Sequence, residues 1–200
     1  GQAWQDATVF EAVAMGIGGN NYYKNCYVDL KESCLRSETT VKVFDQMRKL
    51  QGFTDEGSPG RDWNVATGMV IEGKAGFQIM GDWAKGEFTA AGKVPGVDYY
   101  CAATPSNNGY LYNVDSFIFY KSSDPDKQAG QKLLAKLMMG KNFQKVFNLY
   151  KGSIPARLDV SMDEFDKCAK TSNADIKTAG ASGGLVPSFA HGMAQGNTMK

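Results

Sequence analysis

The sequence is poor in the residues that metal sites and nucleotide-driven enzymes need. It has a single histidine, His191, among 200 residues, and none of its four cysteines belongs to a CxxC pair. A structural zinc site requires four closely grouped Cys or His ligands, so we expect no metal and no cofactor. A P-loop and a GxGxxG motif after a strand are also missing. These absences argue against a nucleotide-binding enzyme.

The chain also has little net charge and no long apolar run. Lys and Arg total 22 and Asp and Glu total 21, so no basic stripe is available to neutralise nucleic-acid phosphates. The longest apolar runs are only a few residues, which excludes a membrane span. Apolar residues at 42% and aromatics at 12% are sufficient for a packed core. The chain begins at Gly1 without an initiator Met or a leader, so we expect a removed leader or a piece of a longer chain.

Four cysteines are present, and they allow three disulfide pairings. The simplest pairing joins Cys26 to Cys34 within a polar loop and Cys101 to Cys168 over a long span. An even cysteine count favours the oxidised form, and the alternative is four reduced thiols in a cytosolic protein.

Apolar spacing and turn residues predict strands that alternate with helices. The clearest helix covers 39–51, where Val43, Met47 and Leu50 share one face and Gly52 provides a stop. Further helices are predicted over 6–15, 62–72, 125–139, 142–150 and, from a capping box at Ser161 and Glu164, 161–178. Strands are predicted over 75–80, 98–102 and 110–120, followed by a short apolar segment at 185–193. This alternation indicates an α/β protein.

Aromatic and polar residues stand at the predicted ends of these elements, where α/β proteins place their ligands. Trp83 follows Gly81-Asp82 at a strand-to-helix corner, Asp115 opens an aromatic strand, and Lys151 precedes a loop. An indole covers the C–H face of a sugar, while a carboxylate and an ammonium bond its hydroxyls. A glycoside hydrolase using Asp82 and Asp115 and a non-catalytic carbohydrate-binding module remain alternatives.

In order along the chain, these segments resemble the extracellular solute-binding proteins of bacterial ABC sugar importers, within them the glucose/mannose-binding branch of Gram-negative bacteria. The resemblance covers essentially the whole chain, and its most specific stretch is Gly81-Asp82-Trp83-Ala84-Lys85-Gly86-Glu87-Phe88. The other segments that carry it are Gly1-Gln2-Ala3-Trp4-Gln5-Asp6-Ala7-Thr8, Val43-Phe44-Asp45-Gln46-Met47-Arg48-Lys49-Leu50, Gly60-Arg61-Asp62-Trp63-Asn64, Asn113-Val114-Asp115-Ser116-Phe117, Lys151-Gly152-Ser153-Ile154-Pro155-Ala156-Arg157 and Leu185-Val186-Pro187-Ser188.

The resemblance implies a role for individual residues. Trp83 matches the tryptophan that stacks on the sugar, and Asn113 and Asp115 match the polar pair that bonds its hydroxyls. Lys151 matches a lysine of the same site, His191 matches a histidine after the final Pro-Ser segment, and Trp4 is placed at the entry to the second lobe. No residue is expected to be catalytic. Cys101 and Cys168 fall where a bond inside one lobe is expected, and the oxidising periplasm permits it.

The family fold is α/β and two-lobed, of the periplasmic-binding-protein type II class, with the sugar held between the lobes. Its chain is about twice this length, so the resemblance implies a fragment that lacks much of the first lobe. Residues 1–107 are then expected in the second, C-terminal lobe, 108–151 in a crossing strand and return excursion into the first lobe, and 152–200 in second-lobe helices. That excursion is expected to expose unpaired edges and an apolar face.

The resemblance also implies partners and a location. The expected partners are a monosaccharide of the glucose, mannose or galactose class and the permease subunits. The full-length protein is expected to be monomeric and located in the Gram-negative periplasm.

Overall fold

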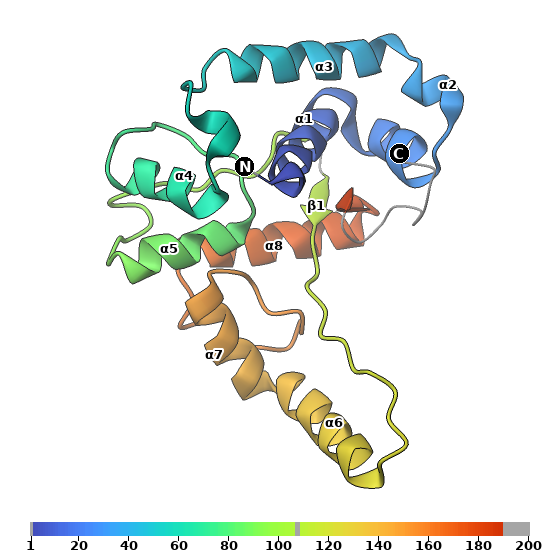
Figure 1. Cartoon of the computed structure of the whole chain (residues 1–200), viewed down its shortest axis with the longest axis vertical. Helices are drawn as coiled ribbons and strands as arrows, with labels where there is room; N and C mark the ends of the chain where they lie inside the picture. Colours follow the sequence, from blue (N-terminus) through green and yellow to red (C-terminus); the bar gives the residue numbers. More distant parts are fainter. Residues whose placement is uncertain (1, 107–108, 190–200) are drawn as a thin grey trace.

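The computed structural model describes residues 2–106 and 109–189, and its fold is α/β with helices dominant (Figure 1). The helices are α1 (Ala3–Tyr23), α2 (Glu32–Leu35), α3 (Glu38–Gln51), α4 (Trp63–Ile71), α5 (Lys85–Ala90), α6 (Pro125–Met138), α7 (Lys141–Lys151) and α8 (Lys167–Ala181). The strands are β1 (Tyr110–Tyr112) and β2 (Leu185–Pro187), and shorter helical turns are η1 (Lys24–Val28), η2 (Ser58–Gly60) and η3 (Asp82–Ala84).

The main core surrounds α1, which lies between α3 on one side and the β1–β2 pair and α8 on the other (Figure 1). The helix predicted over 39–51 is confirmed as α3, with Val43 fully buried against α1 and Gly52 at its end. Ser37 caps this helix by accepting a hydrogen bond from the Thr40 N–H. The amphipathic pattern therefore places α3 correctly, because one face is apolar and the other charged.

A buried carboxylate joins the first helix to the end of the described chain. Glu11 of α1 accepts hydrogen bonds from the Phe189 N–H at 2.8 Å and from the Tyr23 hydroxyl at 3.3 Å. Burial raises the pKa of Glu11 above its usual range, although these two hydrogen bonds act in the opposite direction. The Phe189 ring stacks on Tyr23 and contacts Tyr27 and Phe10. This cluster fixes the exit of β2 against α1.

The predicted strands are largely wrong in extent. Strand β1 covers 110–112 rather than 110–120, and it pairs in parallel with β2. Segments 75–80 and 98–102 form no strand in the described chain, apart from a single bridge between Pro95 and Tyr99. Phe77 and Tyr100 are exposed, at 95% and 82%, whereas Tyr99 is buried against Phe88. A strand needs a hydrogen-bonded neighbour along its length, and within the described residues these segments have no more than that one bridge.

The helix predicted from Ser161 is also wrong at its start, since α8 begins at Lys167. The side chain of Asp166 accepts the Ala169 N–H at 2.8 Å and is therefore the true cap. Asp166 also forms an ion pair of 2.6 Å with the buried Lys85 of α5. The Ser161 hydroxyl instead donates to Asp163. A distant partner on α5 thus favours the later start.

Both disulfides of the simplest pairing are present. The Cα atoms of Cys26 and Cys34 lie 5.2 Å apart, and those of Cys101 and Cys168 lie 5.8 Å apart. The first bond closes a short loop beside the main core, and the second ties the extended segment after α5 to the first turn of α8. None of the helices in the described part has the length and apolar character that crossing a bilayer requires.

Helices α6 and α7 and the extended segment that precedes them project away from the rest of the molecule (Figure 1). The helices predicted over 125–139 and 142–150 are confirmed here, and the Asp124 side chain caps α6 by accepting the Asp126 N–H. Large apolar side chains of this region face solvent, namely Phe117, Ile118, Phe119, Tyr120, Leu133, Leu134, Leu137, Val146, Phe147 and Tyr150. The projecting part therefore has a large apolar surface that the described chain leaves uncovered.

Candidate functional site

The Trp83 corner is formed where the extended segment after α4 turns into η3 and α5. Gly81 has extended backbone angles, and a side chain there would meet the indole of Trp83. The half-buried Trp83 ring lies 6.3 Å from that of Trp4 at the start of α1, with the two planes tilted by 54°. Two indoles from distant parts of the sequence therefore form one aromatic surface.

The C-terminal end of α7 lies directly against this corner. Gly152 ends α7 with a positive φ of +90°, a conformation that favours glycine. A Cβ atom on Gly152 would lie 2.5 Å from the Gly86 nitrogen, and one on Gly86 would lie 2.9 Å from the Lys151 carbonyl oxygen. The backbones of α5 and α7 can approach this closely because both positions are glycine. This approach brings Lys151 to the Trp83 corner.

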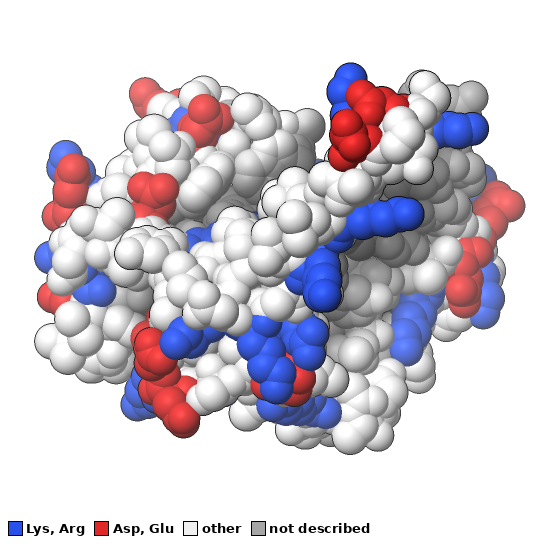
Figure 2. Space-filling view, turned by 90° about the horizontal axis from the view of Figure 1, so that it is seen from below, with Lys and Arg blue, Asp and Glu red and all other residues white. Residues whose placement is uncertain are grey.

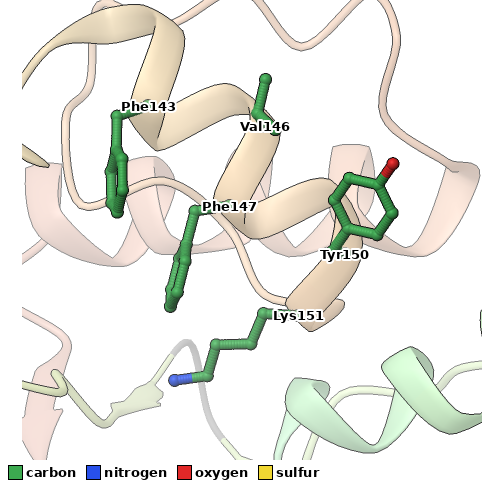
Figure 3. A pocket seen from close by; sticks show the side chains of 5 residues that line it. All are labelled: Phe143, Val146, Phe147, Tyr150 and Lys151. Carbon is green, nitrogen blue, oxygen red and sulfur yellow. The ribbon is translucent and has the colours of Figure 1, made fainter.

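Lys151 forms an ion pair with Asp115, which lies in the extended segment after β1. Its ammonium nitrogen also lies 5.8 Å from the centroid of the Phe147 ring, one helical turn earlier in α7. Figure 3 shows the Lys151 side chain extending beneath Phe147, while Tyr150 points the other way. A shallow cavity of about 510 Å³ is lined by Phe143, Val146, Phe147, Tyr150 and Lys151.

Asn113 follows β1 and lies two residues before Asp115. Its side-chain oxygen accepts a hydrogen bond of 3.1 Å from the hydroxyl of Ser188, just after β2. The two strand ends are thus joined by side chains at the edge where parallel strands place ligand-binding residues. The Asn113 amide also carries two N–H donors in addition to this oxygen.

Asp82 is half-buried beside these residues, and desolvation raises the pKa of its carboxyl. The positive charges of Lys85 and Lys151 and the backbone N–H groups of Ile154 and Trp83 oppose that rise. Lys151 therefore has Asp115 as its ion-pair partner and Asp82 as a second nearby carboxylate. The site combines aromatic surface, a lysine and two carboxylates in one place.

Of the residues predicted for the site, the structure brings Trp83, Trp4, Lys151 and Asp115 together and places Asn113 two residues from Asp115. His191 lies outside the described residues. Phe147 was missed, although its spacing of four residues from Lys151 on a helix is a signal for a contact. Across residues 2–106 and 109–189, no grouping of His, Cys, Asp and Glu that could hold a metal ion is found.

Known proteins resemble this chain along its length. The family model described as bacterial extracellular solute-binding protein matches residues 2–178. A "Probable sugar-binding periplasmic protein" of Brucella suis biovar 1 is 47% identical over 100% of this chain and 47% of its own length. A protein of the same name from Rhizobium meliloti is 45% identical, over 100% of this chain and 48% of its own. An uncharacterized ABC transporter extracellular-binding protein of Pyrococcus horikoshii is 31% identical over 96% of this chain and 42% of its own. The chain spans about half the length of these curated relatives.

Proposed function

The chain belongs to the bacterial extracellular solute-binding proteins, a family of binding proteins rather than enzymes, and from that premise we propose what the complete protein does. It captures a monosaccharide of the glucose class in the periplasm and delivers it to the permease of an ABC importer. The observation that carries this proposal is the convergence of Trp83, Lys151 and Asp115 from three separate segments. The relatives from Brucella suis and Rhizobium meliloti are named as sugar-binding and periplasmic, which supports a sugar as the ligand and the periplasm as the compartment.

The chemistry of these side chains suits a hexose. The indole of Trp83 covers the C–H face of a pyranose ring, and Trp4 extends that apolar surface. Asp115 accepts hydrogen bonds from hydroxyls, while Lys151 and the Asn113 amide donate to them. A hydroxyl that bridges Lys151 and Asp115 replaces their direct ion pair with two charge-assisted hydrogen bonds. No covalent bond is made or broken in this mechanism.

The lobe organisation is part of the same proposal. Residues 1–107 and 152–200 belong to the second lobe, and 108–151 form a crossing strand and an excursion into the first lobe. The uncovered apolar face of α6, α7 and 117–120 supports this division, because such a face needs a partner surface. Sugar then favours closure of the hinge, since only the closed state lets both lobes contact it.

The projecting end of the molecule is positively charged, and this charge bears on how the first lobe would contact it. Residues 121–157 contain eight Lys and Arg but only two Asp and Glu. Figure 2 shows the surface from this end, with many blue side chains near the middle of the view. A first lobe that covers the apolar face is therefore expected to place acidic side chains at the rim of the contact.

We expect the isolated 200-residue chain to bind the dye ANS strongly and the complete protein to bind it weakly. The apolar face of α6 and α7 is open in the first and covered in the second. Leu137→Lys should lower the dye fluorescence of the isolated chain, whereas Val97→Lys, at an exposed apolar position outside 108–151, should lower it less. Equal fluorescence from the isolated chain and the complete protein would contradict the lobe division.

Trp83→Ala and Asp115→Ala, each made in the complete protein, are expected to weaken glucose binding at least tenfold, or about 1.4 kcal/mol. The first loses the stacking surface, and the second loses the hydroxyl acceptor and unpairs Lys151. Titration calorimetry measures the dissociation constants. The matched controls Phe53→Ala and Asp45→Ala alter an exposed aromatic and an exposed carboxylate elsewhere and should leave affinity unchanged. Unchanged affinity in the first pair would refute the site assignment.

The two disulfides support an oxidising compartment such as the periplasm. The intact mass of the secreted protein, measured with and without reductant, checks whether both disulfides are formed.

The preferred epimer and the glucose/mannose branch are tested by comparing the affinities for glucose, mannose and galactose by calorimetry. A site of fixed polar groups rejects a misplaced hydroxyl.

A further inference from the structure

We propose that Ser188 is a positioning residue of the sugar site, which fixes the orientation of the Asn113 side-chain amide. Its hydroxyl donates a hydrogen bond of 3.1 Å to the side-chain oxygen of Asn113. The amide is thereby set to present its two N–H groups, as donors, to a sugar hydroxyl. This inference rests on the proposed function, and it concerns a residue that acts through Asn113 rather than on the sugar itself.

Ser188 is held in place by its own backbone and by that of the next residue. It is 3% exposed and directly follows β2. Its backbone N–H donates to the carbonyl oxygen of Tyr112 in β1 at 2.9 Å. The N–H of Phe189 donates to the buried Glu11 carboxylate at 2.8 Å. The hydroxyl therefore starts from a fixed backbone, as a residue that orients another side chain requires.

Asn113 differs from Ser188, because it is exposed. The terminal torsion of an asparagine is broad and roughly two-fold, so an exposed amide can turn either its oxygen or its nitrogen toward a ligand. Both atoms are bonded to the same planar carbon, so a hydroxyl that holds the oxygen also fixes where the nitrogen lies. The hydrogen bond from Ser188 thus selects one of the two orientations of the amide.

The strand pair does not need this side-chain hydrogen bond in order to form. Strands β1 and β2 already pair in parallel along all three residues of each strand. The backbone hydrogen bond from Ser188 to Tyr112 adds to this pairing. The side-chain bond instead joins the residues just beyond the carboxyl ends of the two strands, at the edge where parallel sheets place binding residues.

The fixed orientation gives the site a donor two residues away from an acceptor. The Asp115 carboxylate, which is paired with Lys151, only accepts hydrogen bonds, whereas the oriented Asn113 amide donates them. A sugar presents hydroxyls that both donate and accept, so this pair can bind neighbouring hydroxyls. A donor that is already in position loses less conformational freedom on binding. Without the Ser188 hydroxyl the amide samples both orientations, and the sugar has to select one of them.

The test is a double-mutant cycle in the complete protein, with Ser188→Ala, Asn113→Ala and the two changes together. Ser188→Ala is expected to weaken glucose binding roughly fivefold by calorimetry, because the amide loses its fixed orientation. In the Asn113→Ala background the same change should alter affinity by less than about twofold, since the amide on which it acts is gone. An equal loss in both backgrounds indicates a side chain that only supports the fold, and it would overturn the proposal.

Asn113→Asp tests which end of the amide meets the sugar. Its carboxylate still accepts the Ser188 hydroxyl but has no N–H to donate. Affinity for glucose should therefore fall at least as far as in Asn113→Ala. Unchanged or tighter binding by Asn113→Asp would show that Asn113 meets the sugar with its oxygen, which contradicts the proposed orientation.

Ser172→Ala is the matched control for the strand. The Ser172 hydroxyl lies 2.6 Å from the Tyr110 hydroxyl, so this change also removes a serine hydrogen bond to β1 while leaving Asn113 in place. It should leave glucose affinity unchanged. Equal losses of affinity in Ser172→Ala and Ser188→Ala would refute the positioning role, because they would assign the effect to the strand rather than to the amide.

The outcomes also separate this inference from the function on which it rests. If the wild-type protein binds none of the hexoses, the proposed function fails and the inference fails with it. If wild type binds glucose and Ser188→Ala binds it equally well, the positioning role is refuted and the function stands.

Discussion

Loss of the Cys101–Cys168 disulfide should lower the free energy of unfolding by about 4 kcal/mol, as the chain-entropy model gives for a long closed loop. The bond spans 67 residues and ties the segment after α5 to the first turn of α8. That segment forms no strand in the described chain, so its other anchors are few. The stacking of Tyr99 on Phe88, with ring centroids 4.1 Å apart, is one of them.

Urea denaturation of the complete protein measures this loss, with both cysteines replaced by alanine. The comparison variant replaces Cys26 and Cys34, whose sequence separation of 8 predicts a smaller loss of about 2.5 kcal/mol. An equal or smaller shift for the long-loop variant would show that loop closure does not govern the stability of this protein.

Gly152→Ala is expected to lower the free energy of unfolding by about 3 kcal/mol, from the strain of a positive φ and the overpacking of a tight contact. Its φ is +90°, and a Cβ atom there would lie 2.5 Å from the Gly86 nitrogen and 3.0 Å from the Lys85 carbonyl carbon. These are backbone atoms, which cannot rotate away as the end of a side chain can. The displaced α7 end should also move Lys151 and weaken glucose binding.

Gly92→Ala is the matched control, because Gly92 has a φ of +69° and a Cβ atom there would meet no neighbouring atom within 4 Å. It should show only the conformational cost of about 1 kcal/mol. Chemical denaturation gives both stabilities, and calorimetry gives the affinities. If the two variants lose the same stability, the close approach of α5 and α7 is not important to the fold.

The helices were predictable because their determinants are local. In α3 the apolar stripe and the Gly52 stop, and in α6 the proline in the first turn, are all present within a dozen residues of sequence. The start of α8 was not predictable in this way. Two candidate caps, Ser161 and Asp166, lie close together, and the ion pair to Lys85 of a distant helix accompanies the second.

The site was predictable in its residue types but not in its arrangement. Trp83 and Lys151 were identified from their motifs, and no local pattern shows that they meet. The two glycines Gly86 and Gly152 make that meeting possible, which only their contact in space reveals. The same holds for Asp82, which the sequence presents equally as a helix cap or as one carboxylate of a glycosidase pair.

By itself, the sequence determined the helices with strong amphipathic patterns, the α/β class and, through its motifs, the resemblance to solute-binding proteins. These depend on short-range spacing and on residue identity. The tertiary structure decided which of the predicted strands form, which cysteines pair and which polar side chains share a site. Each of those depends on a partner that is distant in sequence, since a strand needs a neighbouring strand, a thiol needs another thiol and a buried carboxylate needs donors.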